Sequence, residues 1–279
     1  MACYSLLIDV TKCTGCYNCF LTCRDEYYGN DYGSYSAAQP LDGQFWMQVK
    51  EIERGRYPKP KVDYIPLPCL HCRTAPCVDA AADEAVYRRA DGIVLIDPKK
   101  AKGQRAIVDA CPYRVVFWNS DAEIPQKCTM CAHRLDEGAR EPRCVEACPT
   151  GALVFGDLDN PASEIARLSA SLRTEAYHPE YATEPTVRHV GIPKRFIAGE
   201  VVRSDRRDEC AEGVLITLEG GGQTFQTSSD SYGDFEFDGL ERNVSYEVRI
   251  QHDGYRTQTF EVSTQTDVNL GEVLLEPSR

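Results

Sequence analysis

Fourteen cysteines dominate the chemistry that this 279-residue sequence could perform. Four of them form the run Cys13-Thr-Gly-Cys16-Tyr-Asn-Cys19-Phe-Leu-Thr-Cys23, with the spacing C-x2-C-x2-C-x3-C. A run with this spacing gives three thiolates to one [4Fe–4S] cluster and the fourth thiolate to a second cluster. The run therefore predicts a protein that holds iron–sulfur clusters.

A second run near residue 150 repeats this logic with a longer internal gap. It consists of Cys128-Thr-Met-Cys131, followed by Cys144-Val-Glu-Ala-Cys148-Pro149. If the last cysteine of each run serves the cluster of the other run, two sets of four ligands result. The first set is Cys13, Cys16, Cys19 and Cys148, and the second is Cys23, Cys128, Cys131 and Cys144.

The middle of the chain holds a third set. Cys69-Leu-His-Cys72-Arg-Thr-Ala-Pro-Cys77 and the later Cys111-Pro112 supply four cysteines, namely Cys69, Cys72, Cys77 and Cys111. The same spacing would place the ligands of a fourth cluster at Ala81, Ala101, Gln104 and Ile107, none of which can ligate iron as cysteine does. All four ligands of that cluster are missing together, so the pattern predicts three clusters.

Other uses of these cysteines stay open. Zinc also binds four-cysteine sites built from C-x2-C pairs, so three zinc ions are an alternative. A disulfide framework is disfavoured, because such frameworks belong to short secreted chains. Cys3 and Cys210 lie outside the pattern, and we expect both to be buried small residues or inert thiols. His71 and His133 lie in or beside the ligand loops, where they either hydrogen-bond cluster sulfur or face solvent.

Short strands must position these loops within residues 1–158. We expect strands at Tyr4–Asp9, Gly92–Ile96, Val115–Trp118 and Leu153–Phe155, in two interleaved ferredoxin-like modules. Residues 24–66 form a tyrosine-rich insertion with a strand at Phe45–Ile52, which either covers the clusters, contacts a partner or forms a surface loop. Residues 159–196 are predicted to be a helix capped by Asn160, with Pro161 at its first position, followed by an irregular linker from 176 to 196.

The pattern changes to period two over residues 197–279. Val214, Ile216 and Leu218 alternate with polar residues, and Gly-rich turns separate several such segments. This predicts a small antiparallel β-sandwich of six or seven strands. The predicted fold class is α+β, with an iron–sulfur domain followed by an all-β domain.

Charge and hydropathy exclude other classes of function. The net charge of −12 disfavours binding to nucleic acid. The mean hydropathy is −0.41, and no apolar stretch approaches the roughly 20 residues of a transmembrane helix. The N-terminal residues do not have the pattern of a signal peptide, so a cytoplasmic protein is expected. We also find no catalytic constellation, which favours a non-catalytic role.

Three motifs carry a resemblance to a known family. Asp9-Val-Thr-Lys-Cys13-Thr-Gly-Cys16, Gln126-Lys-Cys128-Thr-Met-Cys131-Ala-His and Cys144-Val-Glu-Ala-Cys148-Pro-Thr-Gly-Ala resemble the iron–sulfur subunits of molybdopterin oxidoreductases of the dimethyl-sulfoxide-reductase family. Those subunits usually hold four clusters. Three clusters and an added sandwich, of the transthyretin or carboxypeptidase-regulatory type, resemble the polyphenol transhydroxylases within the family, and related hydroxylases and dehydroxylases could share these features.

The resemblance implies an electron-transfer subunit in a heterodimer, which could oligomerise further, with a large molybdopterin-containing catalytic subunit. It implies that the first set holds the cluster nearest the molybdenum, the second set the next cluster, and the third set the far one. Two other hypotheses stay open. One is a standalone polyferredoxin that serves several partners, and the other is a zinc-stabilised protein whose sandwich binds a partner.

Overall fold

The computed structural model describes residues 2–278, and its contacts divide the chain into two compact units. Unit 1 ends at Ile52 and resumes from Asp63 to Ile192, whereas unit 2 comprises Glu53–Val62 and the chain from Pro193 onward. Unit 1 therefore contains every cysteine of the three predicted sets. The segment 159–192, predicted to be a helix and a linker, is also counted with unit 1.

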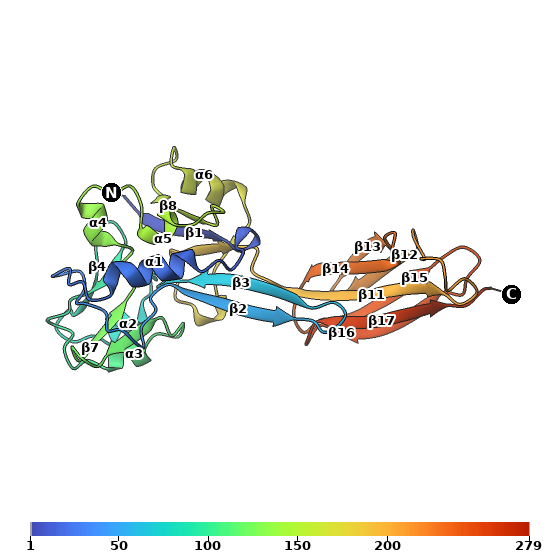
Figure 1. Ribbon diagram of the computed structural model, residues 1–279, viewed down its shortest axis with the longest axis horizontal. Helices are drawn as coiled ribbons and strands as arrows, with labels where there is room; N and C mark the ends of the chain where they lie inside the picture. Colours follow the sequence, from blue (N-terminus) through green and yellow to red (C-terminus); the bar gives the residue numbers. More distant parts are fainter. Residues whose placement is uncertain (1, 279) are drawn as a thin grey trace. The chain divides into compact units, whose positions relative to one another are not determined.

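The central strand of unit 1 is β1 (Tyr4–Asp9), in a sheet with the order β8-β1-β10-β9 (Figure 1). β8 (Leu153–Asp157) pairs with it in antiparallel register, and β10 (Arg188–Val190) pairs with it in parallel; β9 (Thr174–Glu175) forms the edge. The interpretation of 176–196 as an irregular linker is therefore wrong for its β10 segment. Its pairing is long-range, with Leu7 opposite Arg188, and no local pattern marks it.

Three hairpins complete the strands that precede β8, and the first of them extends through Glu53–Val62 into unit 2. They are β2 (Gln48–Arg54) with β3 (Lys61–Leu67), β4 (Val86–Arg88) with β5 (Val94–Ile96), and β6 (Val116–Asn119) with β7 (Ile124–Lys127). The strand predicted at Phe45–Ile52 begins instead at Gln48. Trp46 and Met47 precede it and are buried in the hydrophobic core, so their apolar character reflects core packing and not strand alternation.

The helices of unit 1 are short. They are α1 (Asn18–Tyr27), α2 (Pro76–Asp79), α3 (Ala106–Asp109), α4 (Ala132–Asp136), α5 (Arg143–Glu146) and α6 (Glu164–Ser171), with 3-10 turns η1 (Val10–Lys12) and η2 (Pro179–Tyr181). The prediction that Asn160 caps α6 is wrong. The Ser163 hydroxyl accepts the cap hydrogen bond from Ala166 N, while Asn160 closes the preceding turn through Ala162 N. Within residues 2–278, no helix combines the length and apolar character that crossing a membrane requires.

A separate apolar cluster occupies the positions where a fourth set of ligands would lie. Ala101 and Ile107 are fully buried in it, and Ala81 packs against it. The Gln104 side chain bonds to the backbone of Ala82 and Lys100. Apolar packing thus stands where the spacing had indicated missing ligands.

Unit 2 contains two sheets, with the orders β14-β11-β17 and β13-β12-β15-β16 (Figure 1). The strands are β11 (Arg195–Arg203), β12 (Leu215–Gly220), β13 (Gln223–Ser228), β14 (Asp234–Leu240), β15 (Ser245–Gln251), β16 (Gln258–Ser263) and β17 (Val268–Leu275). The prediction of a wholly antiparallel sandwich is wrong at one pair, because β11 and β17 are parallel. The alternation of apolar and polar residues predicted the strands, but it does not indicate whether a strand pairs in parallel or antiparallel with a strand distant in sequence.

The alternation on β12 generates a test of the sandwich core. Leu218 is fully buried, whereas Leu215 on the same strand is 39% exposed. We expect Leu218→Ala to lower the free energy of unfolding of unit 2 by about 2–5 kcal/mol, because it leaves a cavity. Leu215→Ala should change it by less than about 0.5 kcal/mol. Urea unfolding of the full chain, followed by far-UV circular dichroism, measures both; equal effects would contradict the assigned faces.

Candidate metal centres

The first cysteine set surrounds one pocket. Cys13, Cys16, Cys19 and Cys148 all line it, and its empty volume is about 330 Å³. Cys19 lies on α1 and Cys148 directly after α5, and these two helices contact each other. Burial and, to a smaller extent, the nearby Cys13 and Cys148 raise the pKa of Cys19 to about 12. The fold therefore brings four thiols from two distant segments to one place.

The third set is arranged in the same way. Cys69, Cys72, Cys77 and Cys111 line a pocket with an empty volume of about 360 Å³. Cys69 and Cys72 follow β3, Cys77 lies on α2, and Cys111 follows α3. Burial, followed by contributions from other cysteines of the set, raises the pKa of Cys72 to about 12 and that of Cys77 to about 11.

The second set is the most deeply buried. Its members Cys23, Cys128, Cys131 and Cys144 are each 6–8% exposed. Burial is the main reason that the pKa values of Cys23 and Cys144 are raised, and in both cases Cys128 and Cys131 add to the increase. Four thiols at such short range resist ionisation unless a cation compensates their charge.

The loops of Cys13–Cys16, Cys69–Cys72 and Cys128–Cys131, the first C-x2-C pair in each cysteine group, share one backbone feature. The residue before the second cysteine is Gly15, His71 or Met130, and each has a positive φ, of 67°, 46° and 55°. The backbone N–H of His71 donates to Cys69 Sγ at 3.5 Å, that of Met130 donates to Cys128 Sγ at 3.3 Å, and Gly15 bonds Cys13 likewise. Hydrogen bonds of this kind stabilise a sulfur that carries negative charge.

Cys148 shows what such donors achieve. Burial acts to raise its pKa, but the Thr150 hydroxyl and the backbone N–H groups of Leu153, Thr150 and Ala152 outweigh burial and lower the pKa. All fourteen cysteines are free. Within residues 2–278, no three Cys, His, Asp or Glu side chains gather as the ligands of a single metal ion. Four thiols around the wall of a pocket, with amide donors aimed at sulfur, fit a multi-iron cluster bound through cysteine.

A buried lysine lies between the second and third sets. Lys127 is 2% exposed, and its ammonium group donates to the carbonyl oxygens of Val94 and Cys128. Val94 lines the third pocket, and Cys128 belongs to the second set. The positive charge acts to lower the pKa of Cys77 and Cys128. The sequence motif around Cys128 includes this lysine, but nothing in the motif indicates its role.

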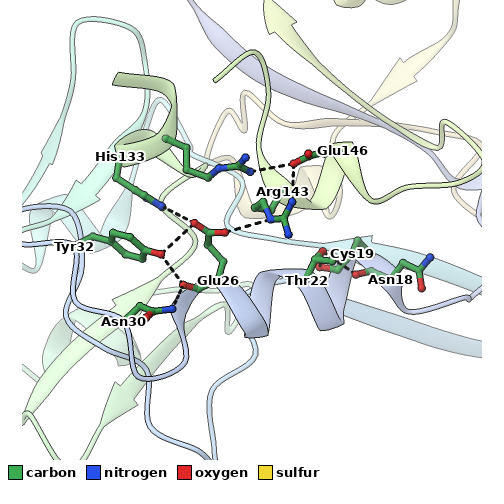
Figure 2. A network of polar contacts seen from close by, with 10 residues as sticks. Asn18, Cys19, Thr22, Glu26, Asn30, Tyr32, His133, Arg143 and Glu146 are labelled. Atoms are coloured by element: carbon green, nitrogen blue, oxygen red, sulfur yellow. Dashed lines mark hydrogen bonds and ion pairs between the residues drawn. The ribbon is translucent and has the colours of Figure 1, made fainter. Parts of the chain in front are cut away.

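A polar network connects the elements around the second set. Figure 2 shows the Glu26 carboxylate of α1 between His133 of α4 and Arg143 of α5. Glu26 Oε1 accepts from His133 Nε2 at 3.0 Å and from the Tyr32 hydroxyl at 3.2 Å, while Arg143 Nε lies 3.3 Å from Oε2. The His133 ring also stacks on Tyr32, at 3.8 Å between centroids. Because these contacts span the sequence, no local motif could have predicted them.

For four single residues the structure bears on the alternatives that the sequence left open, and the inert-thiol alternative for Cys3 and Cys210 stays a prediction. Cys210 is exposed, so it is not a buried small residue, and Cys3 is only partly buried. His71 and His133 are both buried, at 0% and 4% exposure, so the solvent-facing alternative is wrong for each. The tyrosine-rich insertion contributes Tyr27 to the core of unit 1, where its hydroxyl bonds Thr129 at 2.7 Å.

Comparison with known proteins agrees with this geometry. A family model described as a 4Fe-4S dicluster domain matches residues 60–158, and a carboxypeptidase regulatory-like domain matches residues 197–275. These matches confirm the coarse fold class of an iron–sulfur domain followed by an all-β domain.

Curated relatives extend the match to the whole chain. The pyrogallol hydroxytransferase small subunit of Pelobacter acidigallici is 39% identical, over 98% of this chain and 99% of that protein. A tetrathionate reductase subunit of Salmonella typhimurium is 35% identical over 70% of this chain and 74% of its own length. A putative dimethyl sulfoxide reductase iron–sulfur subunit of Halobacterium salinarum is 36% identical over 67% of this chain and 78% of its own length. The chain thus belongs to the family of electron-transferring iron–sulfur subunits of molybdopterin oxidoreductases that includes the pyrogallol hydroxytransferase small subunit.

Proposed function

We propose that this chain holds three [4Fe–4S] clusters and transfers electrons for a molybdopterin enzyme that acts on polyphenols. The observation that carries the proposal is the convergence of twelve cysteines, all except Cys3 and Cys210, into three sets of four. The ligands would be Cys13, Cys16, Cys19 and Cys148; then Cys23, Cys128, Cys131 and Cys144; then Cys69, Cys72, Cys77 and Cys111. When bound, the clusters supply reversible one-electron transfer.

The polyphenol chemistry is inferred from likeness along the whole chain. The relative that matches over 98% of this chain, and hence over the sandwich as well, is named a pyrogallol hydroxytransferase small subunit, whereas the other two relatives match 70% and 67% of this chain. We propose a heterodimer of the pyrogallol–phloroglucinol transhydroxylase type, in the cytoplasm, with the molybdopterin on a large subunit. A related resorcinol hydroxylase or catechol dehydroxylase is the alternative activity, and a standalone polyferredoxin is the alternative assembly.

The surface beside the first set fits contact with that large subunit. Cys16 is exposed, and α1 begins two residues later. Leu21 on α1 is 57% exposed, and its neighbour Phe20 stacks on the exposed Phe45 at 4.9 Å between centroids. Grouped apolar side chains of this size are typical of protein interfaces. We therefore propose that the first set faces the large subunit.

The cluster assignment predicts the metal content of the anaerobically purified protein. We expect about twelve irons and twelve acid-labile sulfides per chain, from three four-iron clusters. Cys72→Ser should lose about four irons, because it removes a ligand of the third set alone. Cys210→Ser is the matched control and should keep the full content, since Cys210 is exposed and outside the sets. Loss of all three clusters in Cys72→Ser would contradict the pairing, and about three zincs per chain without iron would overturn the proposal.

The proposed interface predicts a loss of assembly on charge insertion. Leu21→Glu should reduce the molybdenum that co-purifies with the tagged chain by about tenfold, since a buried carboxylate without a partner opposes association. Its iron content should stay unchanged. Leu215→Glu places the same charge on an exposed leucine of unit 2 and is the control. Equal molybdenum yields from the two variants would place the interface elsewhere, and no co-purifying molybdenum from the unaltered chain would favour a standalone polyferredoxin.

The contacts of Glu26 in Figure 2 are expected to stabilise the fold around the second cysteine set. Glu26→Ala should lower the free energy of unfolding by about 1–3 kcal/mol, because it leaves the buried His133 donor without its acceptor and removes one of the two carboxylates that pair with Arg143. Glu146→Ala is the control, as Glu146 pairs with the same arginine but is exposed, and should have little effect. Loss of iron–sulfur absorbance during urea unfolding reports both variants. An unchanged midpoint for Glu26→Ala would show that the network contributes nothing to cluster retention.

A further inference from the structure

His71 is a fully buried histidine on the wall of the third pocket. Its position is fixed by the backbone on both sides of the loop. Its carbonyl oxygen accepts from the Thr186 hydroxyl at 3.2 Å and from Arg88 at 3.4 Å. Its ring nitrogen Nδ1 lies 3.0 Å from the backbone nitrogen of Val94. The ring is therefore held in one orientation.

The contact between His71 Nδ1 and the backbone nitrogen of Val94 decides which ring nitrogen of His71 carries the proton. The backbone N–H of Val94 can only donate, so Nδ1 must accept with its lone pair. A histidine that accepts at one nitrogen is neutral and carries its single proton on the other, here Nε2. His71 is thus a hydrogen-bond donor at Nε2, fixed by geometry alone.

The Nε2–H group has nothing to donate to among residues 2–278. It is shielded from solvent and has no hydrogen-bond partner there. The pocket wall offers few acceptors, because most of its side chains are apolar and the Tyr113 hydroxyl is already paired with Thr183 at 2.6 Å. A buried donor without an acceptor is costly, and such groups in native proteins usually meet a partner or an ion. The acceptors that other side chains still offer on the wall of this pocket are the sulfur atoms of its four cysteines.

The other buried histidines of unit 1, His133 and His189, each have a hydrogen-bond acceptor for the ring N–H group. His189 Nε2 faces the carbonyl oxygen of Pro66 at 3.2 Å and must donate to it, which leaves Nδ1 as a lone pair. His133 Nε2 donates to the Glu26 carboxylate. His71 differs from both because its backbone contact uses the acceptor and leaves the donor.

We propose that His71 Nε2–H donates a hydrogen bond to a sulfur of the cluster held by Cys69, Cys72, Cys77 and Cys111, and so raises the reduction potential of that cluster. The inference rests on the proposed function, since it requires a cluster in the third set. The physical reason is that the reduced cluster carries one more negative charge, so a donor to its sulfur stabilises the reduced form more than the oxidised form.

Two variants separate the acceptor from the donor of this ring. His71→Asn keeps an oxygen near the position of Nδ1 for Val94 but removes the donor at Nε2. His71→Gln is the matched control, since its longer amide can return an N–H group to the position of Nε2. The readout is a potentiometric titration of the purified complex, followed by electron paramagnetic resonance, with iron measured in each sample.

We expect His71→Asn to lower the potential of the third cluster and leave the other two unchanged. We expect the hydrogen bond to favour the reduced over the oxidised cluster by up to about tenfold in the equilibrium constant, which corresponds to a shift of up to about 59 mV for a one-electron couple. His71→Gln should restore part of this shift. An unchanged potential in His71→Asn, or an equal shift of all three clusters, would overturn the inference.

A measurement on the unaltered protein keeps the test valid if a variant fails to fold. With histidine labelled by ¹⁵N in its ring only, so that the backbone nitrogen of His71 beside Cys69 Sγ gives no signal, pulsed electron paramagnetic resonance of the reduced third cluster should detect a coupled nitrogen, and its absence would overturn the inference. Failure of the proposed function and failure of the role of His71 give different results. If the unaltered chain holds only eight irons and lacks the third signal, the proposed function fails; if all three signals are present without the coupling and the shift, only the role of His71 fails.

Discussion

Unit 1 is constrained above all by the close, buried placement of its cysteines. Ionised thiols would repel one another there, because water cannot screen their charge. Burial and the neighbouring cysteines together raise the pKa values of Cys19, Cys72 and Cys128 to about 12. Ionising such thiols without a cation is therefore unfavourable near neutral pH. Six of the cysteines also belong to the main hydrophobic cluster of the unit. In our proposal, the iron both compensates the charge and completes the core, so that folding and cluster binding are coupled.

The architecture connects the three sets through shared elements. α1 carries Cys19 for the first set and Cys23 for the second, four residues apart. α5 carries Cys144 for the second set and is followed by Cys148 of the first, and the two helices contact each other (Figure 1). The second and third sets are joined by Lys127, and Cys69 acts on the pKa of Cys128. Neighbouring sets therefore lie close together, as a protein that transfers electrons between clusters requires.

The features that could be predicted from the sequence are those that depend on residues close together in the chain. Cysteine spacing on short loops predicted which thiols converge, because each loop holds its cysteines within a few residues; that they ligate clusters stays a prediction. The strand at Tyr4–Asp9 was predicted with its observed bounds. Long-range features were missed. The parallel partner of β1, the contacts of Glu26 and the burial of Lys127 all join segments more than thirty residues apart, and the residues involved have no distinctive local pattern.

The apolar cluster at the four positions without cysteine shows why a fourth set could not be partly present. An incomplete set would leave thiols with raised pKa values and no compensating cation, or a cavity in place of a cluster, and both are destabilising. Here Ala101 and Ile107 are fully buried in an apolar cluster, and Gln104 satisfies its amide on the backbone. Cys77 and Cys111 pack against the same apolar cluster. The third set therefore borders a region consolidated by packing and not a fourth set of thiols. In our proposal the third set holds the far cluster of the relay, and a donor to its sulfur would act at the end of the relay opposite the large subunit.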